Sequence, residues 1–183
     1  MKIKKLSLPG PYLIEPKIFF DKRGSLYESW NESNFSKKKI ITKISQVTVT
    51  RSKKNVLRGL HFQYPNLQGK LISVMNGKIF DVIVDIRKNS PNFGKWCSVI
   101  LDSKKKKILW IPKGFGHGYL VLSTYADVIY KCDCKYYPKN QREIIWNDQF
   151  IKINWPIKNP ILSKKDAAGL KLNEIKKLPK WKK

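Results

Sequence analysis

Short runs of alternating apolar and polar residues, separated by turn-forming residues, occupy most of this chain of 183 residues. Within residues 57–63, alternation places the odd-numbered positions, His61 among them, on one face of a strand and the even-numbered positions, Arg58 among them, on the other. Roughly ten such runs, with regular turn signals and almost no helical spacing, predict an all-β sandwich or barrel.

Turn chemistry in the first third of the chain predicts where it reverses. Asp21 to Gly24 separates two strand-like pieces, because Gly24 can take a positive φ. Asn31 is placed to cap a short helix over residues 31–36. We expect the chain to continue from residue 40 as strand, turn and strand, with the turn near residues 52–55.

The middle of the chain contains pairs of apolar runs that suggest hairpins. Asn76-Gly77 lies between runs at 70–75 and 78–87 and predicts a β-hairpin, because both turn residues tolerate positive φ. Residues 96–101 and 107–111 are expected to pair across a lysine-rich turn. Two further strand-like runs follow, at 116–122 and 127–135.

Helix-like spacing of apolar residues appears only after Leu162, and Pro179 ends it. The spaced residues are Leu170, Leu172, Ile175 and Leu178. We therefore expect a short helical C-terminal tail on the β domain.

Length and cysteine content indicate one domain that needs no disulfides. A chain of this size buries about 70% of its unfolded surface. Cys97, Cys132 and Cys134 are odd in number and form no C-x-x-C pair, which favours a reducing, cytoplasmic location. The basic N-terminus lacks the apolar core of a signal peptide, and no apolar run approaches the ~20 residues that span a membrane.

The formal net charge of +25 suggests attraction to polyanions or to a small anionic substrate. The lysines, however, come in short clumps such as Lys37 to Lys39 and Lys104 to Lys107, mostly where turns are expected. This placement favours a lysine-rich surface on an ordinary fold, so we expect neither nucleic acid nor membrane as the partner.

Histidine occurs only twice, and both positions fall in motifs that resemble those of the cupin jelly roll. His61 lies in a predicted strand, and His117 ends the P-x-G-x-x-H run that starts at Pro112. Metal-binding cupins carry H-x-H and a later glutamate in the first motif, whereas this chain has His61-x-Gln63 and no acidic residue after it on that strand. Two imidazoles are too few for a firm divalent site, so we expect no bound metal. His61 is then a base or a hydrogen-bonding residue of the core.

Three other side chains could share a pocket with His61. Tyr130 lies in an alternating run, where its hydroxyl points either into a pocket or to solvent. Lys70 opens a strand, and Asp166 follows Leu162 near the return of the chain. A carboxylate can orient an imidazole and stabilise its protonated form, but an Asp at this position is also typical of a helix cap.

The motifs taken together resemble the dTDP-4-dehydrorhamnose 3,5-epimerases, metal-free enzymes of the cupin fold. Any one motif is weak, but their order along nearly the whole chain is specific. The matching motifs are Asp21-x-Arg23-Gly24-x3-Glu28, Gln46-Val47, Val56-Leu57-Arg58-Gly59-Leu60-His61-Phe62-Gln63, Gln68-Gly69-Lys70-Leu71, Asp81-Val82-Ile83-Val84-Asp85-Ile86-Arg87, Ser90-Pro91-Asn92-Phe93-Gly94-Lys95-Trp96, Ile111-Pro112-x2-Phe115-Gly116-His117-Gly118, Tyr130-Lys131, Trp155-Pro156 and Leu162-Ser163-x2-Asp166.

The resemblance implies a cofactor-free epimerisation at C5 and C3 of a nucleotide-linked 4-keto-6-deoxy sugar. His61 corresponds to the base of the family and Asp166 to the carboxylate paired with it. Tyr130 corresponds to the acid that donates from the opposite face, as inversion requires. Lys70 corresponds to the cation that stabilises the enolate oxygen.

The resemblance also implies binding roles. Arg23 and Arg58 correspond to residues that meet the diphosphate, where a guanidinium suits paired oxygens. The remaining expected contacts with the substrate are Glu28, Gln46, Val47, Thr48, His117, Tyr136, Glu143 and Lys165, with Glu28 and Glu143 near the nucleotide, Tyr136 stacked on its base and Lys165 at a phosphate.

The family forms homodimers with exchanged N-terminal strands, so Arg23 and Glu28 are expected to serve the neighbouring site. The implied organisation is one domain over 1–183, with a jelly-roll core at about 40–135, N-terminal strands at 1–36 in the dimer contact and a C-terminal extension at 150–183.

Two positions depart from the pattern of the family and leave the exact nucleotide and sugar open. Thr48 stands where the family usually has Asn, and Leu26 stands where it often has an aromatic residue. Three alternatives therefore stay open: an epimerase that inverts a single centre of another nucleotide-linked 4-keto sugar, a non-catalytic cupin that binds a sugar nucleotide, and a metal-dependent cupin.

Overall fold

The computed structural model describes residues 1–38, 40–41 and 43–181 and consists mainly of two antiparallel sheets. The six-stranded sheet has the order β1 (Lys2–Lys5), β2 (Tyr12–Glu15), β10 (Ile108–Ile111), β7 (Lys70–Asn76), β12 (Tyr125–Cys132) and β5 (Gln46–Lys53). The five-stranded sheet has the order β13 (Gln141–Glu143), β6 (Leu57–Gln63), β11 (Phe115–Val121), β8 (Lys78–Asp85) and β9 (Trp96–Asp102).

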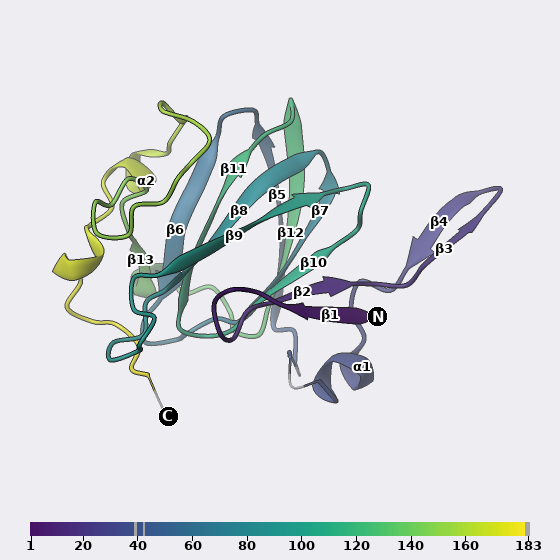
Figure 1. Cartoon of the computed structure of the whole chain (residues 1–183), viewed down its shortest axis with the longest axis horizontal. Coiled ribbons are helices and arrows are strands. Elements are labelled where there is room, and N and C mark those ends of the chain that lie inside the picture. The colour runs from purple at the N-terminus through teal and green to yellow at the C-terminus, as the bar shows by residue number, and fades with distance from the viewer. Residues whose placement is uncertain (39, 42, 182–183) are drawn as a thin grey trace.

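Between β6 and β13 the chain changes sheet at nearly every connection, and only β8 and β9 are both consecutive and paired. This alternation between two facing sheets is that of a jelly roll, which confirms the predicted all-β fold class. Figure 1 shows the sandwich, with the small sheet of β3 (Ile18–Asp21) and β4 (Gly24–Tyr27) projecting away from its body.

The predicted hairpins in the middle of the chain are wrong, although most strand positions are right. β7 and β8 flank Gly77 but lie in different sheets, and the same holds for β9 and β10. Gly77 has φ +82°, and a Cβ there would collide with the carbonyl oxygen of Tyr125. The glycine therefore makes a tight crossover between sheets, because turn residues determine where a chain reverses and not which strand it pairs with.

The helical elements are short. α1 (Glu32–Ser36) confirms the predicted helix, and the side chain of Asn31 accepts a hydrogen bond from the backbone N–H of Asn34 as its N-cap. The other helical elements are η1 (Pro138–Asn140), α2 (Lys164–Ala167) and η2 (Leu172–Glu174). No helix among the described residues is long and apolar enough to cross a membrane.

The C-terminal segment is less helical than predicted. Its helical parts are one turn at α2 and one 3₁₀ turn at η2, and residues 175–181 are largely irregular. Leu172 and Ile175 pack with Leu57 and Leu60 of β6 in one buried cluster. The spacing of apolar residues therefore reflects packing of an irregular segment onto a sheet and not a continuous helix.

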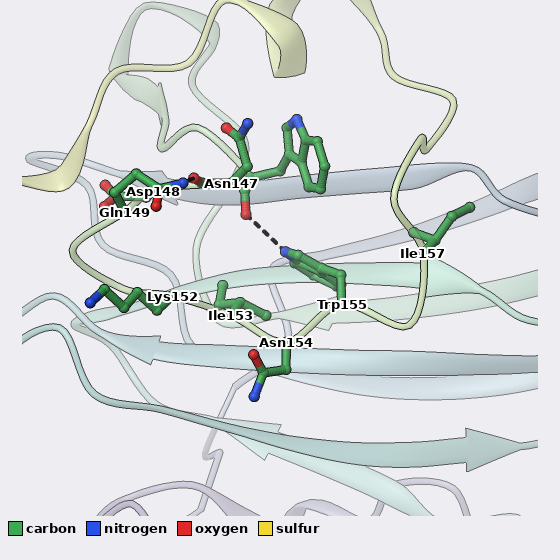
Figure 2. Close-up of a pocket in the computed structure, with 9 residues that line it drawn as sticks. Asn147, Asp148, Gln149, Lys152, Ile153, Asn154, Trp155 and Ile157 are labelled. Carbon is green, nitrogen blue, oxygen red and sulfur yellow. Dashed lines mark hydrogen bonds between the residues drawn. The ribbon is translucent and has the colours of Figure 1, made fainter.

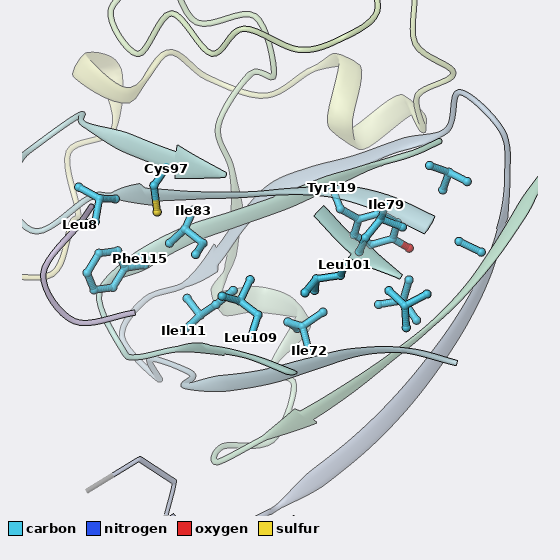
Figure 3. Close-up of a cluster of buried hydrophobic side chains, with 14 residues drawn as sticks. Leu8, Ile72, Ile79, Ile83, Cys97, Leu101, Leu109, Ile111, Phe115 and Tyr119 are labelled. Atoms are coloured by element: carbon cyan, nitrogen blue, oxygen red, sulfur yellow. The ribbon is translucent and has the colours of Figure 1, made fainter. Parts of the chain in front are cut away.

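A buried apolar cluster between the sheets supports the site. Its members come from both sheets and include Ile72 of β7, Ile83 of β8 and Tyr119 of β11, as Figure 3 shows. Tyr130 of β12 packs against this cluster from its edge. The cluster thus holds the strands that carry the candidate catalytic residues in fixed positions.

Candidate active site

A cavity of about 270 Å³ is lined by residues of both sheets and contains half of the predicted site residues, among them His61, Lys70 and Tyr130. The lining residues are Gln46, Thr48, Thr50, Arg58, His61, Gln68, Lys70, Tyr130, Cys132, Tyr136 and Gln141. Candidate groups for proton transfer, charge stabilisation and phosphate binding therefore face one space. This is the combination expected of a small-molecule site.

A bulge in β6 brings Arg58 and His61 to the same cavity. His117 of β11 is paired with His61, and Tyr119 is paired with Arg58, so that two residues of β6 between these pairs stand opposite one residue of β11. The extra residue shifts the alternation by one position. The prediction that Arg58 and His61 lie on opposite faces is therefore wrong, and Leu57 and Leu60 share the opposite, apolar face.

His61 forms a close pair with Asp166, as the resemblance implied. The imidazole Nε2 lies 2.6 Å from Oδ1 of Asp166, and the side chain of His61 keeps 30% exposure toward the cavity. Ser163, the N-cap of α2, donates its hydroxyl to Oδ2 of Asp166 at 2.7 Å, and the N–H of Gly59 donates to Oδ1 at 3.3 Å.

The surroundings of Asp166 decide its charge. Burial raises the pKa of this carboxyl, but the hydrogen bonds from His61 and Ser163 outweigh burial, and the pKa is lowered. An ionised carboxylate only accepts hydrogen bonds, so the neutral imidazole of His61 carries its proton on Nε2. Nδ1 is then the nitrogen that can accept a further proton.

Tyr130 and Lys70 face the cavity from the six-stranded sheet, opposite the strand of His61. Burial raises the pKa of Tyr130 well above its ordinary value, and the neighbouring phenol of Tyr119 raises it further. Tyr130 is therefore a neutral proton donor at physiological pH. Burial lowers the pKa of Lys70, and the nearby Cys132 and Asp81 partly counteract this effect.

His117 does not line the cavity, contrary to the expected contact with substrate. Its side chain is 3% exposed, and Nε2 lies 3.0 Å from both carboxyl oxygens of Asp81, which is fully buried. The imidazole ring packs edge-on against the ring of Tyr130, with centroids 5.9 Å apart. His117 therefore lies behind the wall of the cavity and supports Tyr130.

The edge strand β5 places some predicted binding residues in the cavity and turns another away. Gln46 and Thr48 line the cavity, and their side chains hydrogen-bond to each other at 3.0 Å. The side chain of Gln46 also accepts from the N–H of Tyr136 at 2.6 Å, which fixes the start of a loop at the cavity. Val47 points to the opposite face of β5 and is 56% exposed.

Two other predicted residues lie near the cavity but do not line it. Glu143 of β13 is the cross-strand partner of His61, and it accepts a hydrogen bond from Gln141 at 2.7 Å. Lys165 is exposed on α2, next to Asp166 in the chain.

Arg23 and Glu28 lie outside the cavity of this chain. Arg23 is at the tip of the β3–β4 hairpin, where it pairs with Asp21 at 2.6 Å and its side chain is 84% exposed. Glu28 follows β4 and accepts hydrogen bonds from Asn31 and Asn34. The hairpin projects from the sandwich, so neither residue reaches the cavity within one chain (Figure 1).

Four residues that line the cavity were missed by the sequence analysis, namely Thr50, Gln68, Cys132 and Gln141. Thr50 could have been found, because it continues the alternation of Gln46 and Thr48 along one face of β5. Cys132 continues the alternation of Tyr130 on β12 in the same way. Gln68 and Gln141 lie in or beside loops, where no periodicity points to them.

A second cavity, of about 310 Å³, lies within residues 146–157 (Figure 2). The indole N–H of Trp155 donates to the carbonyl of Trp146 at 2.8 Å across it. None of the predicted site residues lines this cavity. Among the residues that the structure describes, no group of three His, Cys, Asp or Glu side chains is arranged to hold a metal ion.

Comparisons with known proteins agree with these motifs. Residues 5–174 match the model of the family described as dTDP-4-dehydrorhamnose 3,5-epimerase. An enzyme of that name from Salmonella typhimurium is 47% identical over 178 residues, which cover 95% of this chain and 97% of the relative.

Solved structures extend the comparison to the fold. A dTDP-6-deoxy-D-glucose-3,5-epimerase from Legionella pneumophila, crystallised with dTDP-4-keto-L-rhamnose, has a TM-score of 0.96 and 44% identity, covering 100% of this chain and 99% of that chain. A 3'-monoepimerase from Streptomyces bikiniensis, in complex with dTDP-quinovose, has a TM-score of 0.86 and 31% identity, covering 92% of this chain and 86% of that chain. The match to the family model and the identity over nearly the full length show that the chain belongs to the dTDP-4-dehydrorhamnose 3,5-epimerase family.

Proposed function

We propose that the chain catalyses epimerisation at C3 and C5 of dTDP-4-dehydro-6-deoxy-D-glucose, giving dTDP-4-dehydro-L-rhamnose. The observation that carries this proposal is the placement of His61 and Tyr130, which face one cavity from strands of opposite sheets. Inversion needs a base on one side of the sugar ring and an acid on the other, and a single group would tend to return the proton to its original face.

The protons at C3 and C5 are acidic because both carbons are adjacent to the C4 ketone. His61 takes such a proton on its free ring nitrogen, and the ionised Asp166 stabilises the imidazolium that forms. Tyr130 then gives its hydroxyl proton to the same carbon from the other side. The product differs from the substrate only in the configuration at that carbon.

The step that needs most stabilisation is the formation of the enolate, in which negative charge develops on the C4 oxygen. Lys70 is buried at the cavity, where a cation interacts with an enolate oxygen more strongly than it does in water. The side chain of Arg58, held by a hydrogen bond from Nε to Ser52 at 2.9 Å, is available for the diphosphate. Tyr136, 42% exposed at the mouth, presents a ring on which the base of the nucleotide can stack.

We further propose that the protein is a cytoplasmic homodimer in which the β3–β4 hairpin of one copy reaches the site of the other. The hairpin exposes Phe19 by 52%, Phe20 by 78% and Leu26 by 69%. The edge strand β5 exposes Val47 and Val49, which supply an apolar surface beside the cavity. In such a dimer Arg23 and Glu28 of a second copy complete the binding of the nucleotide.

Proton NMR of dTDP-4-dehydro-6-deoxyglucose with the protein in D₂O tests the reaction. We expect both the C3 and C5 proton signals to disappear as deuterium enters, and both losses to slow when Tyr130→Phe removes the acid. Retention of both signals with wild-type protein would remove the proposed substrate and direct attention to other nucleotide-linked keto sugars.

Epimerisation at a single centre is the second candidate, and the similarity to a 3'-monoepimerase favours considering it. The same acid–base pair would serve either reaction. Deuterium at only one of the two carbons, with the other proton signal intact, would establish this alternative in place of double inversion.

A further inference from the structure

Tyr136 lies at the mouth of the cavity, on a part of the chain that no strand or helix holds in place. Residues 133–137 connect β12 to η1 without regular secondary structure. A ring on an irregular segment offers a precise stacking surface only if the backbone beneath it is fixed by other contacts. The inference developed below rests on the proposed stacking of the nucleotide base on Tyr136.

Gln63, at the end of β6, holds this segment on both sides of Tyr136. Its Oε1 accepts a hydrogen bond from the N–H of Tyr137 at 2.6 Å, and its Nε2 donates to the carbonyl of Lys135 at 3.1 Å. Nε2 also donates to the carbonyl of Asn66 at 2.8 Å. Both donors of the carboxamide and its acceptor are therefore used. Gln63 thus connects the residues before and after Tyr136 to each other and to the loop that follows β6.

Two glutamines that line the cavity bond to the same segment. Oε1 of Gln46 accepts from the N–H of Tyr136 at 2.6 Å, and Nε2 of Gln68 donates to the carbonyl of Cys134 at 2.8 Å. Both side chains are also open to a ligand, so a change at either would disturb the cavity directly. Gln63 differs from them, because it is 3% exposed and does not line the cavity. Its effect on a ligand must therefore pass through the segment that it holds.

The position of Gln63 on β6 links this support to the proposed base. Gln63 lies two residues after His61, beyond the bulge, so the alternation of the strand places both side chains on one face. Their cross-strand partners on β13 are Gln141 and Glu143. A single strand therefore fixes the sugar end and the nucleotide end of the site relative to each other.

We propose that Gln63 is a positioning residue for the nucleotide, because it fixes the backbone on both sides of Tyr136 and so places the ring on which the base stacks. Gln63 touches neither the base nor the reacting carbons. Loss of its amide would leave the N–H of Tyr137 and the carbonyl of Lys135 without these partners. Unpaired backbone groups are costly, so the segment would shift to pair them elsewhere, and the ring would lose its place.

Gln63→Met tests this role, because it keeps the approximate length of the side chain and removes its hydrogen bonds. Calorimetry measures the affinity of each variant for dTDP. We expect Gln63→Met to weaken dTDP binding by about fivefold to tenfold, because a displaced ring keeps only part of its contact with the base. The rate of deuterium exchange at saturating dTDP-4-dehydro-6-deoxyglucose should change by less than about twofold while KM rises, since the catalytic groups lie on strands.

Tyr136→Ala provides the decisive comparison, because it removes the ring through which Gln63 is proposed to act. By itself this change should weaken dTDP binding by about 5- to 150-fold, the range for a stacked base. Adding Gln63→Met to Tyr136→Ala should cause no further loss, whereas a merely structural role would add its own loss.

Gln149→Met is the matched control. Gln149 also donates from its side chain to a backbone carbonyl, that of Asn147 at 3.0 Å, but it is exposed and does not line the cavity. This variant should bind dTDP with the affinity of wild type.

A further loss of dTDP affinity in the double variant would overturn the proposal, and so would unchanged affinity of Gln63→Met alone. If Gln63→Met fails to fold by circular dichroism, Gln63→Asn, whose shorter side chain breaks the same set of hydrogen bonds, takes its place in the comparison. Wild-type affinity of Tyr136→Ala would remove the base site and this inference with it. Absence of deuterium exchange with wild-type protein would contradict the proposed reaction alone, so the two failures are distinguishable.

Discussion

The two histidines are cross-strand neighbours, on β6 and β11, and each pairs with an aspartate, yet the two pairs differ in almost everything else. His61 is partly exposed to the cavity, and its partner Asp166 has a lowered pKa. His117 is buried, and burial raises the pKa of its partner Asp81, although His117 and Lys70 counteract this in part.

The difference lies in the other donors that surround each carboxylate. Asp166 accepts hydrogen bonds from Ser163 and from the N–H of Gly59 in addition to His61. Among the described residues, the side chain of Asp81 is hydrogen-bonded to His117 alone. The same two residue types thus give a partly exposed pair at the cavity, which suits the base proposed for His61, and a buried pair in the core, and their different hydrogen-bonding partners account for the difference.

Loss of the His61 side chain should give the largest effect. We expect His61→Ala to reduce the rate of deuterium exchange by ~10²–10⁴-fold, the usual contribution of a general base. Binding of dTDP, measured by calorimetry, should stay close to that of wild type, because the diphosphate contacts belong to other residues. Substantial residual exchange would mean that another group takes the proton.

His117→Asn is the matched control for this change. It leaves a buried carboxylate with a poorer partner, which should reduce the free energy of unfolding by about 1–3 kcal/mol. Exchange of deuterium should nevertheless persist far above the level of His61→Ala. If the two variants lost activity equally, the assignment of His117 to a supporting role would be wrong.

Removing the charge of Asp166 should have the next largest effect. We expect Asp166→Asn to lower kcat by about 10²-fold, the lower end of the range for acid–base groups, because the imidazole remains but loses its orienter and its counter-charge. Ser163→Ala removes one donor to this carboxylate and should give a smaller loss, measured in the same exchange assay. A larger loss with Ser163→Ala than with Asp166→Asn would contradict this order.

These contrasts show how far the sequence alone can lead. Local chemistry predicted the turn at Asp21 to Gly24 and the cap at Asn31, because each depends on residues within one turn of chain. The pairing of strands was not predictable from Asn76-Gly77, since a tight turn can join strands of one sheet or of two. The bulge that turns Arg58 and His61 to one side has no marker in the alternation itself.

The sequence predicted best those site residues that lie in recognisable motifs. The residues around His61, Lys70 and Tyr130 belong to ordered motifs, and the cavity brings them together. Asp166 is 105 positions from His61, so only a resemblance could connect them. Gln68 and Gln141 were not predicted, because they lie in or beside loops, where no periodicity shows which side chains face a cavity.

The opposite pKa shifts of the two carboxyls predict opposite dependences of stability on pH. The folded-state pKa of Asp166 is lowered, so its contribution to stability is present above the unperturbed value of 3.8 and is lost as pH falls through the folded pKa. The folded-state pKa of Asp81 is raised, so its charge becomes a cost to folding as pH rises from 3.8 through the folded pKa.

Urea unfolding followed by tryptophan fluorescence, between about pH 3 and pH 6 to span the ordinary carboxyl range, measures both dependences. The free energy of unfolding of wild type minus that of Asp166→Asn should rise with pH across this window. The corresponding difference for Asp81→Asn should fall, because the variant never acquires the buried charge. Parallel slopes would show that both carboxyls have the same charge state, and the contrast between an ionised orienter at the cavity and a supporting pair in the core would then be lost.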